Sequence, residues 1–248
     1  MRAVICCAIV IAALAAPMAA SAQPAQPPAA RAIKIPATLP PDVAFARQLA
    51  FLRADLLIAD ALVKERDWVD ARPHAEFPRE EVYGVIREDL RTYKVPAFDG
   101  ALRELASAIR ARNVKAYERA LGKVRASLAA ADTALKAKQP DWPRFTLQVA
   151  VATLSRVPEE YDDAVTDGRV RAVGYQSARG LVFEAAQMIE SAGAAPGEKD
   201  AQAFGELRAS LSQLKSAFGP LAAPKQAPVD PATVKSLVAQ IEAAARRL

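Results

Sequence analysis

The chain has a single histidine, His74, and it stands in a short stretch rich in carboxylates. Glu76, Glu80 and Glu81 follow it within eight residues. Imidazole nitrogen together with carboxylate oxygen suits iron, zinc, manganese or copper. These four residues are therefore the first set of candidate metal ligands. The alternative is that Glu80 and Glu81 occupy the first turn of a helix, where the helix dipole favours negative charge, and that His74 is an exposed loop residue.

A second acidic cluster follows Pro158 and consists of Glu159, Glu160, Asp162 and Asp163. Four acids within five residues repel one another unless water or a bound cation separates their charges. They are the second set of candidate metal ligands. Their spacing does not match an EF-hand loop. The alternative interpretation is a short, solvated acidic helix.

Several other chemistries are excluded by residue content. One histidine cannot supply the two Glu-x-x-His pairs of a ferritin-like di-iron centre. Covalent haem attachment needs Cys-x-x-Cys-His, which is absent. Neither a P-loop nor a dinucleotide fingerprint is present, and Gly-x-Ser-x-Gly is missing. The sequence therefore predicts a non-catalytic protein without haem or nucleotide, whose one conceivable cofactor is a metal ion, with iron favoured.

The first 22 residues have the pattern of a secretory signal peptide. Arg2 supplies a positive start, an uncharged apolar run extends over residues 4–16, and Ala20-Ser21-Ala22 forms the small-x-small pattern that signal peptidase reads. We expect cleavage after Ala22 and a periplasmic mature protein that begins at Gln23. Both cysteines lie in the removed segment, so the mature chain would hold no disulfide and no thiolate ligand.

Composition favours an all-α fold. Hydrophobic residues make up 52% of the chain and charged residues 25%, which is enough to build a core. Glycine is scarce, with ten residues in 248, and alanine is abundant, which favours helix. No segment alternates convincingly with period two, so the sequence predicts no sheet.

Apolar residues at spacings of three and four predict about eight helices in two bundle halves. A Pro/Ala-rich linker over residues 23–41 leads to an N-terminal half over residues 42–138 and a C-terminal half over residues 144–248. The first helix is expected to end near residue 69, and the two prolines of residues 71–78 predict a connection. Asp42, Asp99 and Asp230 are placed to begin helices, and Asn113 can either close one helix or cap the next.

Charge and hydropathy limit the partners. The net charge of +5 is spread along the chain, and basic patches interleaved with aromatic residues are absent, which argues against a nucleic-acid partner. After the signal segment, no stretch of 18 uncharged apolar residues could form a membrane span. A protein partner is left as the expectation, either a membrane metal transporter or another periplasmic protein.

One segment resembles a known family. Glu160-Tyr161-Asp162-Asp163-Ala164-Val165-Thr166-Asp167-Gly168 followed by Tyr175-Gln176 is similar to the extracytoplasmic helical domain of bacterial high-affinity iron permeases. The family pattern has glutamate where this chain has Gly174, and the chain lacks the permease membrane helices with their Arg-Glu motifs. The resemblance implies a stand-alone periplasmic relative with an accessory role in metal uptake or homeostasis.

Two hypotheses follow. The first is a periplasmic helical protein that binds a metal ion, with iron favoured, or assists its transporter. The second is a periplasmic binding module that recognises a protein or small ligand through its helix faces, without metal.

Overall fold

A computed structural model describes residues 39–193 and 198–248, the side chains of residues 198–200 excepted. These residues belong to one compact unit of the chain, residues 32–248. The predicted signal peptide over residues 1–22, and all of the predicted linker over residues 23–41 except its last three residues, lie outside the described part of the chain.

The all-α prediction is confirmed. The described residues form the helices α1 (Pro41–Lys64), α2 (Trp68–Phe77), the π-helix η1 (Pro78–Tyr83), α3 (Gly84–Thr92), α4 (Asp99–Arg110), α5 (Val114–Lys136), α6 (Trp142–Leu154), α7 (Val157–Ala164), α8 (Ala172–Ala192), α9 (Glu198–Ala217) and α10 (Pro231–Ala245). Among these described helices, none has the length and apolarity that a membrane crossing requires.

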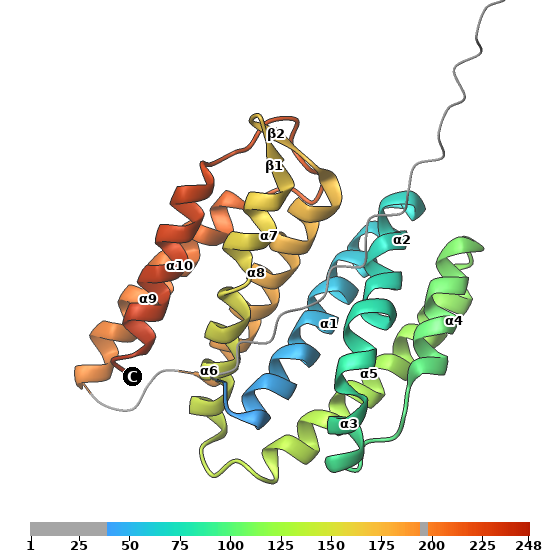
Figure 1. The fold of residues 1–248 in the computed structure, drawn as a ribbon, viewed down its shortest axis with the longest axis horizontal. Helices are drawn as coiled ribbons and strands as arrows, with labels where there is room; N and C mark the ends of the chain where they lie inside the picture. Colours follow the sequence, from blue (N-terminus) through green and yellow to red (C-terminus); the bar gives the residue numbers. More distant parts are fainter. Residues whose placement is uncertain (1–38, 194–197) are drawn as a thin grey trace, which may run out of the picture. The chain divides into compact units, whose positions relative to one another are not determined.

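Helix α1 packs against helices from both predicted halves (Figure 1). It contacts α2 and α5 of the segment 42–138, and α6 and α8 of the segment 144–248. Its apolar residues point in several directions, and Leu49, Leu52 and Ile58 are fully buried. The two segments are therefore joined through this helix.

Residues 71–78 do not form the predicted connection. They are helical, with Pro73 inside α2 and Pro78 at the start of the π-helix η1, and α3 follows without a loop. A proline removes a donor and crowds the preceding turn, and a π-turn is one way to accommodate this. Ala71, His74 and Ala75 are buried, and α2 packs against α1 and α4. Packing against α1 and α4 therefore outweighs the low helix propensity of the two prolines.

Helices α4 and α5 form an antiparallel pair whose pattern was predicted correctly. Asn113 caps α5 by accepting a hydrogen bond from the backbone N–H of Ala116 at 3.0 Å. The spacing of apolar residues predicts a buried face on α5 that consists of Val114, Tyr117, Leu121, Val124, Leu128, Ala131 and Leu135. All of them are buried except Val114, which is half-buried. Asp230 is likewise confirmed as a cap, since it accepts from the backbone N–H of Ala232 at 2.7 Å. Asp141 caps α6 in the same way, which was not predicted.

The prediction of no sheet is wrong at one place. Strands β1 (Val165–Thr166) and β2 (Arg169–Val170) pair in an antiparallel hairpin. The two residues between them, Asp167 and Gly168, both have positive φ, 51° and 72°. This is the turn that Asp-Gly pairs favour. The hairpin pairs in turn with the segment before α10, since the backbone N–H of Ala227 donates to the carbonyl of Gly168 at 3.0 Å.

Residues 142–245 form a four-helix bundle in which α6 and α7 together make up one member. A short break around Ser155 separates α6 from α7. Helix α8 packs against both α6 and α7, and α10 packs against α6, α7 and α9 (Figure 1). Tyr161 and Tyr175 hold the α9–α10 connection, since their hydroxyls donate to the carbonyls of Val229 and Pro220 at 2.9 and 3.2 Å.

Two glycines allow α8 to approach its neighbours closely. A Cβ at Gly180 would lie 2.7 Å from the backbone oxygen of Ala54 in α1. A Cβ at Gly174 would lie 2.8 Å from the Cβ of Ala164 in α7. The glycine that replaces the glutamate of the family pattern at position 174 is therefore at a point of close helix contact. Larger side chains at either position would force the helices apart.

This close contact makes a stability prediction. Gly180→Ala should lower the free energy of unfolding by roughly 1–3 kcal/mol, because the backbone of α1 must move to admit the methyl group. Gly122→Ala is the matched control, since nothing lies within 4 Å of a Cβ there, and it should raise stability by roughly 0.5–1 kcal/mol. Urea unfolding followed by circular dichroism measures both changes. Equal effects of the two substitutions would contradict the α1–α8 contact.

Candidate functional site

His74 lies in the core between α1, α2 and α8, not in an exposed loop. Its side chain is fully buried. The Nδ1 atom is 3.1 Å from Oδ1 of Asp55 in α1, and Nε2 is 3.2 Å from Oε1 of Gln176 in α8. Both ring nitrogens that could bind a metal therefore already have protein partners.

The orientation of the Gln176 amide indicates where the protons lie. Its nitrogen faces the carboxylate of Asp70 at 3.4 Å, so its oxygen faces His74 and accepts from Nε2–H. Burial raises the pKa of Asp55, and the nearby Glu160 raises it further, while the hydrogen bond and the charge of His74 lower it.

The other predicted ligands near His74 lie on the surface or in ion pairs. Glu76 accepts from Arg72 and Arg110 at 3.0 and 2.9 Å. Glu80 and Glu81 lie in the first turn of η1, where the acidic residues were expected if they serve a helix terminus. The three glutamates of the predicted set therefore lie on the outer side of α2 and η1, whereas His74 points inward.

The second acidic cluster lies on α7 and is organised by one arginine. Arg156 has a mostly buried side chain and pairs with Glu159 at 2.5 Å and Glu160 at 2.7 Å. Asp162 is exposed. The backbone carbonyl of Asp163 accepts from the guanidinium of Arg171 at 3.1 Å. This arrangement places positive charge where a bound cation would have to lie.

The two clusters are linked electrostatically through Asp55, which contacts His74 and whose pKa is raised by the charge of Glu160. Across residues 39–193 and 198–248, no three His, Cys, Asp or Glu side chains come together in a way that could hold a metal ion. Metal binding at Glu76, Glu159 or Glu160 would require the carboxylate to leave an arginine. Binding at His74 would require a ring nitrogen to leave its protein partner.

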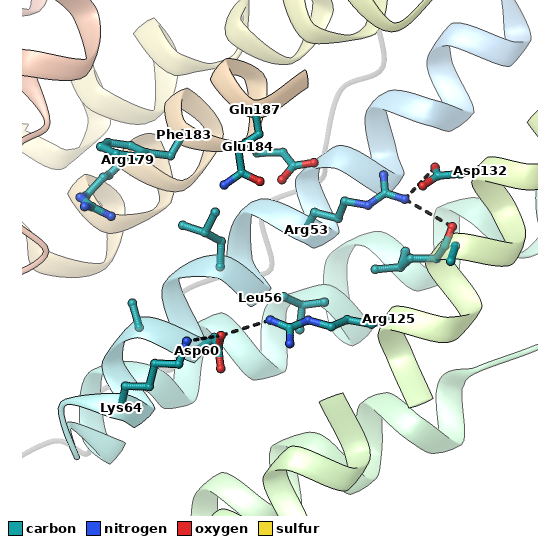
Figure 2. A pocket seen from close by; sticks show the side chains of 14 residues that line it. Arg53, Leu56, Asp60, Lys64, Arg125, Asp132, Arg179, Phe183, Glu184 and Gln187 are labelled. Carbon is teal, nitrogen blue, oxygen red and sulfur yellow. Dashed lines mark hydrogen bonds and ion pairs between the residues drawn. The ribbon is translucent and has the colours of Figure 1, made fainter. Parts of the chain in front are cut away.

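A different site is formed where α1, α5 and α8 meet. They enclose a pocket of about 660 Å³ (Figure 2). Leu56, Leu57, Leu128 and Phe183 supply apolar walls. The polar lining consists of Arg53, Asp60 and Lys64 from α1, Arg125 and Asp132 from α5, and Arg179, Glu184 and Gln187 from α8.

Ion pairs organise one side of this pocket. Arg53 donates to Asp132 at 2.7 Å and to the carbonyl of Leu128 at 3.3 Å, which ties α1 to α5. Asp60 accepts from both Lys64 at 3.0 Å and Arg125 at 3.1 Å (Figure 2). One carboxylate therefore serves two cations on this wall.

Glu184 is the unusual group of the pocket. It is only 6% exposed, and its carboxyl group makes no hydrogen bond or ion pair within the described part of the chain. Burial raises its pKa to about 7, the charge of Arg53 opposes this rise, and Asp132 adds to it. Glu184 is thus a carboxyl group that is partly protonated at neutral pH and that faces a cavity.

The polar residues that line this pocket were not predicted from the sequence to form a site. A signal was present, because Glu184 interrupts the apolar run Leu181-Val182-Phe183 and Ala185-Ala186. A charged residue at a core position of an amphipathic helix either has a buried partner or lines a site. That Glu184 lines a site becomes clear only from the tertiary structure, in which α1 and α5, both distant in sequence, line the pocket together with α8.

Comparison with known proteins concerns the second part of the chain. Residues 136–248 match the family model of the iron permease-associated 4-helix bundle domain. The resemblance predicted from residues 160–179 is confirmed, and the match extends over α6 to α10. No curated protein and no solved structure matches the chain. The match links this segment to iron uptake, and the pocket lies between its helix α8 and two helices from outside it, α1 and α5.

The raised pKa of Glu184 makes stability depend on pH. The folded protein holds this proton up to about pH 7, whereas an unfolded chain releases it near 4.5. The stabilisation of the folded protein by this proton is therefore complete below pH 4.5, and it is lost as the pH rises through 7. A tenfold change in proton affinity corresponds to about 1.4 kcal/mol, so this loss could reach about 3 kcal/mol.

Glu184→Gln should remove this contribution to the pH dependence. The variant should become more stable relative to the wild type as pH rises from 5 to 8, because the amide never ionises. Urea unfolding at several pH values measures the difference, and Glu104→Gln serves as the exposed control. A difference between Glu184→Gln and wild type that stays constant with pH would contradict the raised pKa.

Proposed function

We propose that this protein is an exported, non-catalytic helical module that assists iron uptake beside a membrane metal transporter. The observation that carries the proposal is the match of residues 136–248 to the iron permease-associated 4-helix bundle domain. Within that bundle, the hydroxyls of Tyr161 and Tyr175 hold the connection between the last two helices. The periplasmic location rests on the signal-peptide pattern of the first 22 residues.

The non-catalytic role is supported by the position of His74. The sole imidazole of the chain is fully buried and both of its nitrogens are engaged. A general base must reach the proton that it abstracts, and this imidazole is shielded from any substrate. The role of His74 in the proposal is to link α1, α2 and α8.

An assisting role fits the geometry better than a resident metal at the predicted ligands. Arg156, Arg72 and Arg110 occupy the space around Glu159, Glu160 and Glu76. A cation bound there would have to displace an arginine from each carboxylate. Iron would accordingly be cargo that passes between this protein and the transporter, not a permanent part of its fold.

Export gives a direct test. Mass spectrometry of the intact protein from the periplasm of the producing cell should give the mass of residues 23–248, with Gln23 as the first residue. Replacing Ala20 and Ala22 with larger residues should block this processing, because signal peptidase requires small side chains there. An intact N-terminus beginning at Met1 in the wild-type protein would contradict cleavage.

The link to iron is tested by uptake. Deleting the gene in its own organism should lower the uptake of radioactive iron under iron limitation, and a plasmid copy of the wild-type gene should restore it. Manganese and zinc uptake in the same strains is the control and should not change. Iron uptake that is identical with and without the gene would overturn the proposed function.

A further inference from the structure

The pocket between α1, α5 and α8 carries an excess of positive charge. Four cations line it, namely Arg53, Lys64, Arg125 and Arg179. Arg53 is neutralised by Asp132, and Lys64 and Arg125 share the single carboxylate of Asp60. With Glu184 protonated, four positive charges therefore face two negative ones. Coulomb attraction in a partly enclosed site favours an anion of about two charges.

Arg179 is available to such an anion. It donates to the backbone carbonyls of Phe218 and Gly219 at 3.1 and 3.4 Å, which are neutral groups. Its guanidinium lies 4.2 Å from the ring centroid of Phe183, and this contact holds it at the pocket wall. A guanidinium fixed in this way can pair with a carboxylate in a bidentate manner.

The surroundings of Glu184 also point to a ligand. The residue is only 6% exposed and lines the cavity, and its carboxyl group makes no hydrogen bond to the described residues. Buried polar groups without a partner are uncommon in proteins. In its neutral form Glu184 can donate a hydrogen bond to a carboxylate oxygen, and the amide of Gln187 on the next turn can do the same.

We propose that this pocket binds a small organic anion with two or more carboxylate groups, either free or as a ferric chelate. Lys64, Arg125 and Arg179 neutralise the carboxylates, Glu184 donates to one of their oxygens, and Leu56, Leu57 and Phe183 cover the carbon skeleton. The volume of about 660 Å³ is within the usual range for small-molecule sites. The free-anion form stands on the pocket alone, and only the ferric form rests on the proposed function.

Calorimetry with sodium citrate and with ferric citrate tests the proposal on the exported, processed protein. The variant Lys64→Gln/Arg125→Gln removes two exposed cations of the pocket and should weaken binding at least tenfold. The variant Arg103→Gln/Lys123→Gln removes two equally exposed cations outside the pocket and should bind like wild type. Circular dichroism confirms that both variants are folded.

The role of Glu184 has its own readout. At pH 6, Glu184→Gln and wild type should bind citrate alike, because both present a neutral donor. At pH 8 the wild-type carboxyl group is mostly ionised, so Glu184→Gln should bind roughly tenfold more tightly. Comparing the two proteins at the same pH removes the effect of citrate's own ionisation. The other charged groups of the pocket are the same in both proteins.

The outcomes separate the two forms of the ligand. If the protein binds both probes and the Lys64→Gln/Arg125→Gln variant binds neither, the pocket is a site for the free carboxylate. If the protein binds ferric citrate but not sodium citrate, the pocket is a site for the chelate. If neither probe binds more tightly than about 1 mM, or if the pocket variant and the control bind alike, the proposal is overturned. The iron-uptake assay is independent of this result, so either proposal can fail without the other.

Discussion

The close contact of α1 and α8 at Gly180 is the constraint on which the rest of the structure depends. The backbone oxygen of Ala54 lies where a side chain at position 180 would begin. This contact brings Asp55 and Arg53 of α1 within reach of Gln176 and Glu184 of α8. The buried hydrogen-bond network and the pocket thus depend on the same helix pair, and a displacement of about one methyl group would affect both.

The buried polar groups that flank this contact differ in how they are satisfied. His74 has a partner for each ring nitrogen, so its desolvation cost is offset by hydrogen bonds, and it connects three helices. Glu184 has no such partner and reduces its cost by holding a proton instead. The hydrogen-bonded arrangement of His74 is typical of a structural core, and the unpaired carboxyl group of Glu184 is typical of a ligand-binding site.

The position of the pocket also bears on the relation to iron uptake. The segment that matches the iron permease-associated domain contributes α8 with Arg179 and Glu184, whereas α1 and α5 come from residues outside that match. A bundle consisting of residues 136–248 alone would present Glu184 on an open helix face. The preceding helices convert this face into one wall of a partly enclosed pocket and add the cations Arg53, Lys64 and Arg125. The ligand specificity would therefore belong to this chain, not to the matched bundle in general.

The sequence by itself determined the helical class, most helix boundaries and the family resemblance, because these depend on local features. The spacing of apolar residues fixed most of the buried face of α5, and Asn113 and Asp230 marked the starts of two helices. Residues 160–179 carried the resemblance that the family match confirms over residues 136–248. The hairpin at Asp167 and Gly168 was missed although its turn signal is local.

Only the tertiary structure decided what the polar residues do. The predicted site of His74, Glu76, Glu80 and Glu81 rested on their nearness in sequence. In a helix, however, these side chains point in different directions. His74 points inward and contacts Asp55 and Gln176. Arg53, Arg125 and Glu184 share one pocket although they lie on three separate helices. A site made from distant segments depends on helix packing, and the periodicity of a single sequence shows which face of a helix is buried but not which helix covers it.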